Sequence, residues 1–248
     1  MSDRTETIEV AGNNIECRVR DGRQPGVVFL GGFMSDMSGT KATMLDDYCR
    51  KRGQAYVRFD YSGHGVSGGD FKDGTIGQWA ADAVAVLDQV TQGPQLLVGS
   101  SMGGWIALLL ARARPDRVAG FVGIAAAPDF TEDMMWADFD ETIRETLRTE
   151  GLYYQPSDYD DPYPITMRLI EEGRNNLVLR SSLLLNCPVR LIQGMQDPDV
   201  PWQTALRLAE HLTADDVEVT LVKNGNHSLS EPADLARLEI ALDRLLNT

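Results

Sequence analysis

Short apolar runs alternate with longer amphipathic stretches along most of the chain. Six runs rich in valine, leucine, isoleucine and phenylalanine predict buried strands, each followed by glycine, proline, aspartate or asparagine. They lie at 27–30, 54–59, 95–98, 118–124, 189–192 and 217–222. Helical patterns predict helices at 39–52, 76–91, 102–114, 202–212 and 232–246. This alternation is typical of α/β proteins with a parallel sheet.

Two more strands are expected near the amino terminus, at residues 5–10 and 15–20. They would form an antiparallel hairpin at one edge of the sheet. The whole pattern predicts a mostly parallel, eight-stranded sheet flanked by helices.

The segment 129–182, here called the cap segment, interrupts the alternation because it contains no clear strand. Its 13 acidic and 5 basic residues give a balance of −8, more than half of the chain's −14, and it holds four of the seven tyrosines. We interpret it as a helical cap inserted between strands six and seven of a core formed by residues 1–128 and 183–248. The alternative is a solvated helical excursion over one edge of the sheet.

A cap of this kind would cover a substrate pocket with its apolar inner face. The apolar candidates for that face are Met134, Met135, Trp136, Met167 and Leu169. We expect the pocket itself to be lined by Met34, Trp136, Tyr153, Tyr154 and Trp202.

Composition narrows the classes of function. A length of 248 residues with 43% hydrophobic residues fits one globular domain. The formal charge of −14 would repel nucleic acid phosphates, which excludes nucleic acid as the main partner. The longest apolar run, 105–111, is far shorter than the roughly 20 residues of a membrane span, so none is expected. Acidic residues near the start, and no apolar core there, predict a cytoplasmic protein.

The three cysteines, Cys17, Cys49 and Cys187, are widely spaced and form no CxxC pair. This pattern favours reduced thiols over a disulfide framework or a cysteine-rich metal site. We expect neither a metal nor an organic cofactor.

The motif G-x-S-x-G occurs at 99–103, with Ser101 at its centre. It lies between a predicted strand and a predicted helix, which is the context of a nucleophile elbow. The small residues Gly99 and Gly103 leave room for the strained backbone of such a turn. The motif therefore predicts Ser101 as the nucleophile of a serine hydrolase with an α/β-hydrolase fold.

A serine hydroxyl needs a base, and the chain has three histidines. His227 follows the last predicted strand, where the order serine, acid, histidine of this fold expects the base. We interpret His211 as a helix-terminal cation and His64 as part of a glycine-rich loop, although His64 could border the pocket.

Three aspartates compete for the role of the acid that orients His227. Asp197 follows the strand at 189–192, so its carboxylate emerges at the carboxyl edge of the sheet. Asp197 is therefore preferred, with Asp199 as a near alternative and Asp129 as a more remote one.

The oxyanion formed by nucleophilic attack needs two backbone N–H donors. We expect one from Met102, directly after the nucleophile, and one from Phe33, which follows Gly31 and Gly32 after a strand. The alternative for the two glycines is a plain turn.

Several segments together resemble the acyl-protein thioesterase family typified by abhydrolase domain-containing protein ten. The resemblance runs from about residue 26 to the end, and its most specific stretches are 32–41, 58–63, 97–105 and 186–202, with the cap pattern G-x-x-x-x-P-S-x-Y at 151–159. It implies removal of long acyl chains from cysteine thioesters and hydrolysis of some activated esters. It also implies Ser101, Asp197 and His227 as nucleophile, acid and base.

We therefore expect hydrolysis of an acyl thioester or ester through an acyl-enzyme on Ser101, with an S-acylated protein as one candidate substrate. One alternative is a general carboxylesterase for small or aromatic esters. Another is a noncatalytic binding module on the same scaffold, because fold does not imply function. The acidic cap segment and the absence of a basic leader depart from the mitochondrial family, so compartment and substrate can differ.

Overall fold

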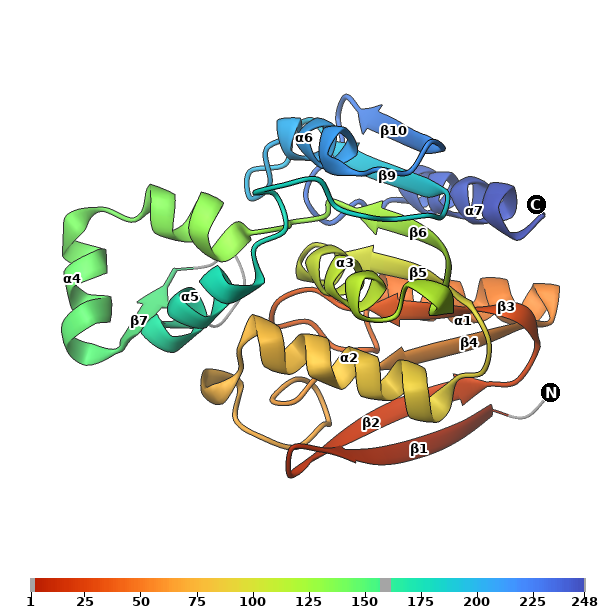
Figure 1. The fold of residues 1–248 in the computed structure, drawn as a ribbon, viewed down its shortest axis with the longest axis horizontal. Helices are drawn as coiled ribbons and strands as arrows, with labels where there is room; N and C mark the ends of the chain where they lie inside the picture. Colours follow the sequence, from red (N-terminus) through yellow and green to blue (C-terminus); the bar gives the residue numbers. More distant parts are fainter. Residues whose placement is uncertain (1–2, 157–161, 248) are drawn as a thin grey trace.

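The computed structural model describes residues 3–156 and 162–247 (Figure 1). Its main sheet has eight strands. They are β1 (Asp3–Val10), β2 (Asn13–Arg20), β3 (Arg23–Leu30), β4 (Gln54–Phe59), β5 (Gln95–Ser100), β6 (Val118–Ile124), β9 (Val189–Gly194) and β10 (Val217–Val222). Their order is β1-β2-β4-β3-β5-β6-β9-β10. β1 and β2 pair antiparallel, as do β2 and β4, and the other neighbours are parallel. The predicted fold class is confirmed.

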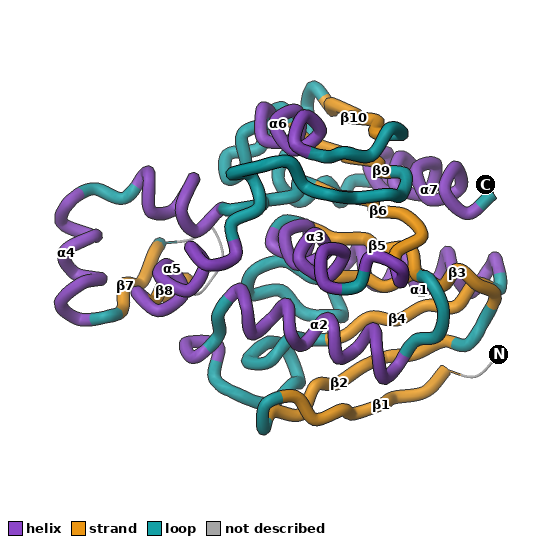
Figure 2. Tube along the Cα trace, viewed as in Figure 1, coloured by secondary structure: helices purple, strands orange, loops and turns teal. Residues whose placement is uncertain are grey.

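Helices cover both faces of this sheet (Figure 2). α1 and α7 pack on one face, whereas α2, α3 and α6 pack on the other. The bounds are α1 (Thr40–Arg52), α2 (Ile76–Val90), α3 (Met102–Ala113), α6 (Gln203–His211) and α7 (Pro232–Leu246), with short 3₁₀ turns η1 (Phe71–Asp73) and η2 (Pro115–Arg117). None of the helices in the described part of the chain has the length and apolar character that crossing a membrane requires.

Alternate residues of the central strands point into the two helical layers. Val28 and Leu97 belong to the core beneath α2 and α3, whereas Val27 and Leu96 belong to the core beneath α1 and α7. This two-residue period is that of any β-strand, and burial on both faces explains the continuous apolar runs in the sequence.

The cap segment leaves the sheet after β6 and returns before β9, and it projects from one end of the molecule (Figure 1). Its elements are a π-helix η3 (Thr131–Trp136), α4 (Glu141–Glu150), β7 (Leu152–Gln155), β8 (Tyr163–Thr166), α5 (Met167–Gly173) and η4 (Arg174–Asn176). The expectation of a segment without strands is wrong, because β7 and β8 form an antiparallel pair. Each has only four residues, too few for a clear period of two. Tyr159, the end of the cap pattern, lies outside the described residues.

Asp129, at the start of the cap segment, holds the end of that segment. Its fully buried carboxylate accepts hydrogen bonds from the backbone N–H groups of Val178 (2.7 Å) and Leu179 (2.9 Å), and from the Arg180 guanidinium (3.1 Å). The place where the chain leaves the sheet is therefore tied to the place where it returns. Burial raises the pKa of Asp129, and these hydrogen bonds oppose the rise.

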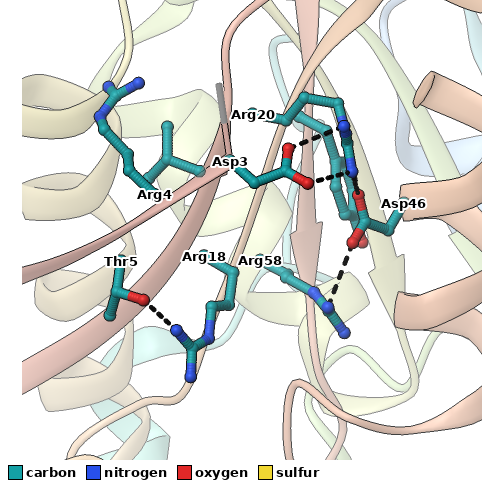
Figure 3. A pocket seen from close by; sticks show the side chains of 9 residues that line it. Asp3, Arg4, Thr5, Arg18, Arg20, Asp46 and Arg58 are labelled. Carbon is teal, nitrogen blue, oxygen red and sulfur yellow. Dashed lines mark hydrogen bonds and ion pairs between the residues drawn. The ribbon is translucent and has the colours of Figure 1, made fainter. Parts of the chain in front are cut away.

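An arginine-rich hollow lies at the edge of the sheet that begins with β1, where β1, β2 and β4 meet α1 (Figure 3). Asp46 on α1 accepts hydrogen bonds from Arg20 on β2 (2.7 Å) and pairs with Arg58 on β4 (3.2 Å). Arg20 also pairs with Asp3 at 2.7 Å. These carboxylates compensate the arginines and link the edge strands to the helix layer.

Candidate active site

Ser101 occupies the sharp turn between β5 and α3. Its backbone has φ 53° and ψ −119°, a conformation rarely adopted by a residue with a side chain. The turn is held at both ends, because the Ser101 N–H donates to the Ile124 carbonyl (2.9 Å) and the Ser101 carbonyl accepts from Gly104 (2.9 Å) and Ala127 (3.1 Å). These bonds fix the strained serine at the carboxyl edge of the sheet.

The glycines around Ser101 are required by close backbone contacts. A Cβ on Gly103 would lie 2.0 Å from the Leu30 carbonyl oxygen, and one on Gly99 would lie 2.4 Å from the Gly103 carbonyl oxygen. Both distances are far below a van der Waals contact, so no side chain fits at either position. The structure thus supplies the reason for small residues on both sides of the serine.

The structure brings Ser101, His227 and Asp197 together from three separate loops. His227 Nε2 lies 3.1 Å from Ser101 Oγ, and His227 Nδ1 lies 2.9 Å from Asp197 Oδ2. In neutral histidine with the proton on Nδ1, that N–H donates to Asp197, and Nε2 accepts from the serine hydroxyl. This geometry suits transfer of the hydroxyl proton to His227.

The Asp197 carboxylate is buried and has further hydrogen bonds. Its Oδ1 accepts from the N–H groups of Asp199 and Val200, each at 2.9 Å, and its Oδ2 accepts from Gln193 Nε2 at 2.9 Å. These bonds fix the orientation of the carboxylate toward His227. Gln193 was missed in the sequence because the predicted strand ended at Ile192. A polar residue at the end of a buried strand is the signal that could have found it.

The loops carrying Asp197 and His227 approach each other closely. A Cβ on Gly194, the last residue of β9, would lie 2.3 Å from the carbonyl oxygen of Gly225, in the loop after β10. Glycine at 194 thus allows the acid and the base to meet.

The other aspartates and histidines considered for the roles of acid and base lie outside the hydrogen-bonded pair of His227 and Asp197. Asp199 is mostly exposed and its carboxylate lies 4.0 Å from His227 Nδ1, whereas Asp129 holds the two ends of the cap segment together. His64 is buried among the rings of Tyr61, Phe71 and Trp79 and is not among the cavity-lining residues. His211 ends α6.

Phe33 lies in the loop between β3 and α1, beside the serine elbow. A Cβ on the preceding Gly32 would lie 3.5 Å from Ser101 Cβ, so the two loops are in close contact. The Phe33 ring makes edge contacts with Phe71 and Phe130, at centroid distances of 4.8 and 5.8 Å. Within the described residues the Phe33 N–H has no hydrogen-bond acceptor. Met102 is the first residue of α3, where helix N–H groups lack intrahelical acceptors. The oxyanion role of both amides stays a prediction.

A cavity of about 910 Å³ adjoins Ser101 and His227. It is bounded by the loop after β3, the cap segment and the histidine loop, and its volume lies in the range of ligand pockets. The apolar part of its wall is formed by Phe29, Phe33, Met34, Phe130, Met134, Met135, Phe139, Ile143, Tyr153 and Tyr163.

Of the five residues expected to line the pocket, Met34 and Tyr153 do so. Tyr154 follows Tyr153 on a β-strand, so its side chain takes the other face and is 53% exposed. Trp136 instead lies beneath the guanidinium groups of Arg144, Arg148 and Arg174, at 5.0–5.5 Å from its ring.

The fifth of these residues, Trp202, is at the start of α6 and is not among the lining residues. Of the other apolar side chains expected on the inner face of the cap, Met134 and Met135 line the cavity, whereas Met167 and Leu169 pack in apolar clusters. Which way each side chain of the cap points depends on packing between elements, which the sequence pattern does not contain.

The described residues hold one group whose ligand atoms are close enough for a metal ion, namely Asp197, Asp199 and His227, with all atoms within 4.8 Å. Asp197 already accepts three N–H donors besides His227. This donor set suits orientation of a histidine better than metal coordination.

Comparison with known proteins places the chain in a family. The model of the alpha/beta hydrolase family matches residues 27–238. The mitochondrial palmitoyl-protein thioesterase ABHD10 of Bos taurus is 38% identical over 236 residues, covering 94% of this chain and 77% of that protein. The Mus musculus protein of the same name is 39% identical, covering 94% and 79%.

Solved structures agree with these matches. A protein from Agrobacterium vitis S4 superimposes with a TM-score of 0.95 at 43% identity, covering 99% of both chains. Alpha/beta hydrolase domain-containing protein 10 from mouse superimposes with a TM-score of 0.91 at 35% identity, covering 98% of both. The thioesterase relatives named above are mitochondrial proteins, and the cytoplasmic address stays a prediction for this chain. By sequence and by structure, the chain belongs to the alpha/beta hydrolase family.

Proposed function

We propose that this protein hydrolyses acyl thioesters or esters through a covalent acyl-enzyme on Ser101. The observation that carries the proposal is the hydrogen-bonded series from Ser101 Oγ through His227 to the buried Asp197 carboxylate, beside a large apolar cavity. The thioesterase name of relatives that match 94% of the chain supports the same class of reaction.

In the first half of the proposed reaction, His227 Nε2 takes the proton of the Ser101 hydroxyl while Oγ attacks the acyl carbon. The Oγ–C bond forms, and the carbonyl oxygen becomes an oxyanion that accepts from the N–H groups of Phe33 and Met102. When the tetrahedral intermediate collapses, the bond to the leaving sulfur or oxygen breaks. His227 then gives its proton to the leaving group.

In the second half, water takes the place of the leaving group. His227 removes a proton from water, the hydroxide attacks the acyl-enzyme carbon, and the same N–H groups hold the second oxyanion. Breakdown releases the carboxylic acid and returns the proton to Ser101 Oγ. Throughout, Asp197 keeps the Nδ1–H tautomer and favours the imidazolium, while Gln193 and two backbone N–H groups keep Asp197 in place.

The apolar lining of the cavity favours an apolar acyl group as the part of the substrate that binds there. The cap segment provides an apolar wall near the serine, formed by Phe130, Met134, Met135, Phe139 and Ile143. Burial of methylene groups against such a wall stabilises binding by about 0.8 kcal/mol each. We therefore propose a preference for long over short acyl chains, with a fatty-acylated cysteine as the natural substrate class.

The proposal is tested with a series of p-nitrophenyl esters and matched acyl thioesters from two to sixteen carbons. We expect kcat/KM to rise with chain length, and Ser101→Ala to abolish both turnover and labelling by a fluorophosphonate probe. Gln78→Ala, a change of a residue outside the described cavity lining, is the matched control. A preference for acetyl or butyryl esters would favour a general carboxylesterase, and equal labelling of wild type and Ser101→Ala would refute the nucleophile.

A further inference from the structure

Lys41 connects helix α1 to the loop that carries His227. It is the second residue of α1, which begins directly after the loop containing Phe33. Its Nζ donates to the carbonyl oxygen of Ser228 at 2.5 Å and lies 3.4 Å from Ser230 Oγ. Ser228 follows His227 in the chain, and Lys41, Ser228 and His227 all line the same cavity.

Lysine is an unfavourable residue for stability at this position. The side chain is partly withdrawn from water, and burial lowers the pKa of Lys41 to about 8, an effect that the field of Asp234 only partly opposes. A cation near the N-terminus of a helix also opposes the helix dipole. Within the described residues, no carboxylate lies within ion-pair distance of its ammonium.

A residue that costs stability and lies beside reacting groups is expected to contribute to function. The three aspartates among the cavity-lining residues, Asp36, Asp138 and Asp199, do not pair with Lys41. Its hydrogen bonds instead go to the segment immediately after the proposed base. The ammonium therefore helps to hold that segment in its observed conformation.

We propose, on the basis of the proposed function, that Lys41 is a positioning residue that fixes the His227 loop relative to the loop supplying the Phe33 N–H. The ammonium donates to the Ser228 carbonyl, so the backbone that follows His227 cannot turn away from Ser101. It also joins α1 to this loop across a separation of 187 residues in sequence. The base and one oxyanion donor thereby keep a constant spacing during both halves of the reaction.

The expected cost of losing this contact is a loss of rate without a loss of binding. A displacement of about 1 Å in a reacting group reduces turnover by about 100-fold. Lys41 belongs to α1 and not to the cap segment that supplies the apolar wall, so we expect KM for a long-chain ester to change little. Removing a partly buried cation should also leave the protein as stable as before, or more stable.

The test compares Lys41→Met with wild type and with Lys51→Met, an exposed lysine in the last turn of the same helix. For p-nitrophenyl dodecanoate, we expect Lys41→Met to lower kcat by about 10- to 100-fold with KM within about twofold. The rate of labelling by a fluorophosphonate should fall by a similar factor, because labelling also needs activated Ser101. The Tm should not fall, and Lys51→Met should behave as wild type.

A second variant restores the ammonium chemically. In Lys41→Cys, alkylation with 2-bromoethylamine forms a thioether as bromide leaves, and the product has the length and charge of lysine. The native Cys17, Cys49 and Cys187 are buried, and burial raises the pKa of these thiols to about 12, 12 and 11, so they should not react. Alkylation should return kcat toward the wild-type value, while wild type treated in the same way should not change.

The outcomes separate this proposal from the proposed function. Residual turnover in Ser101→Ala would overturn the function itself. If Ser101→Ala is inactive, an unchanged kcat in Lys41→Met would overturn the role of Lys41. So would a rise of KM at constant kcat, which would indicate substrate binding, or a loss of kcat that follows a lower Tm and is not restored by alkylation.

Discussion

Replacing His64 with phenylalanine should remove part of the protein's sensitivity to mild acid. The His64 side chain is 3% exposed and is surrounded by the rings of Tyr61, Phe71 and Trp79, at centroid distances of 4.9–5.5 Å. Its Nδ1 lies 3.2 Å from the Ser62 carbonyl oxygen, and Nε2 has no hydrogen-bond partner in the described residues. A proton on Nε2 would create a buried cation with an unsatisfied donor.

Burial lowers the pKa of His64 from 6.5 to about 4. Because the unfolded chain binds this proton at higher pH than the native protein, the neutral imidazole supports folding fully above about pH 6.5, and that support is lost as the pH falls toward 4. A pKa lowered this far corresponds to about 3 kcal/mol in total. About 2 kcal/mol of this should already be lost between pH 7 and pH 5.

The assay is urea unfolding followed by tryptophan fluorescence at pH 5, 6 and 7, for wild type and His64→Phe. A phenyl ring suits the aromatic surroundings, and the Ser62 carbonyl keeps a donor because Trp79 Nε1 lies 3.1 Å from it. The nearby Asp82, which accepts from the Ser62 N–H and hydroxyl, is present in both proteins, so its titration should largely cancel. We expect wild type to lose about 2 kcal/mol more than the variant between pH 7 and pH 5.

The control is Leu87→Ala. It removes buried apolar atoms from α2, the helix that carries Trp79, and leaves every titrating group in place. It should destabilise the protein by about 2–5 kcal/mol at every pH. Parallel losses of unfolding free energy in wild type and His64→Phe would refute the assignment of this acid sensitivity to His64.

Three further predictions concern the active site. Asp197→Asn should lower kcat by about 10³- to 10⁴-fold, whereas Asp199→Asn should stay within about threefold of wild type, as measured by steady-state ester hydrolysis. Equal losses would contradict the choice of acid. Gly103→Ala places a Cβ 2.0 Å from the Leu30 carbonyl oxygen, so we expect destabilisation by at least about 4 kcal/mol in thermal unfolding, and a wild-type Tm would contradict the packing. Ile143→Trp, which narrows the cavity, should lower kcat/KM for dodecanoyl esters by at least about tenfold while acetyl esters change little, and parallel losses would show that the acyl chain binds elsewhere.

Most of the fold could be predicted from the sequence, because most helices and strands have a local pattern of apolar and polar residues. The runs at 54–59, 118–124 and 217–222 coincide with β4, β6 and β10, and the helix at 232–246 coincides with α7. Burial of both faces made the central strands continuous apolar runs, whereas β10 at the edge of the sheet alternates and is only partly buried. Glycine or a polar residue marked the ends of the strands. Short elements without such a pattern, β7 and β8, were not recognised.

The site was predictable only where a residue's place follows from topology. Ser101, Asp197 and His227 each follow a parallel strand, and the carboxyl ends of parallel strands meet at one edge. The contacts of Lys41 and Gln193 with the site form only in the folded protein, and neither residue belongs to a motif. The orientation of Trp136 depends on three arginines that pack over its ring, so an apolar pattern alone placed it wrongly.

The carboxylate of Asp129 fixes the two ends of the cap segment relative to each other. Since its entry and exit are joined by one buried group, the 130–177 stretch forms a closed excursion whose two ends stay at a fixed separation. A cap from a relative could be transplanted between these anchor points without altering the register of β6 and β9. Such a replacement would have to keep the contacts that join the cap segment to the core between its two ends, namely Glu172 with the Gly77 N–H and the Asn176 carbonyl with Trp105 Nε1.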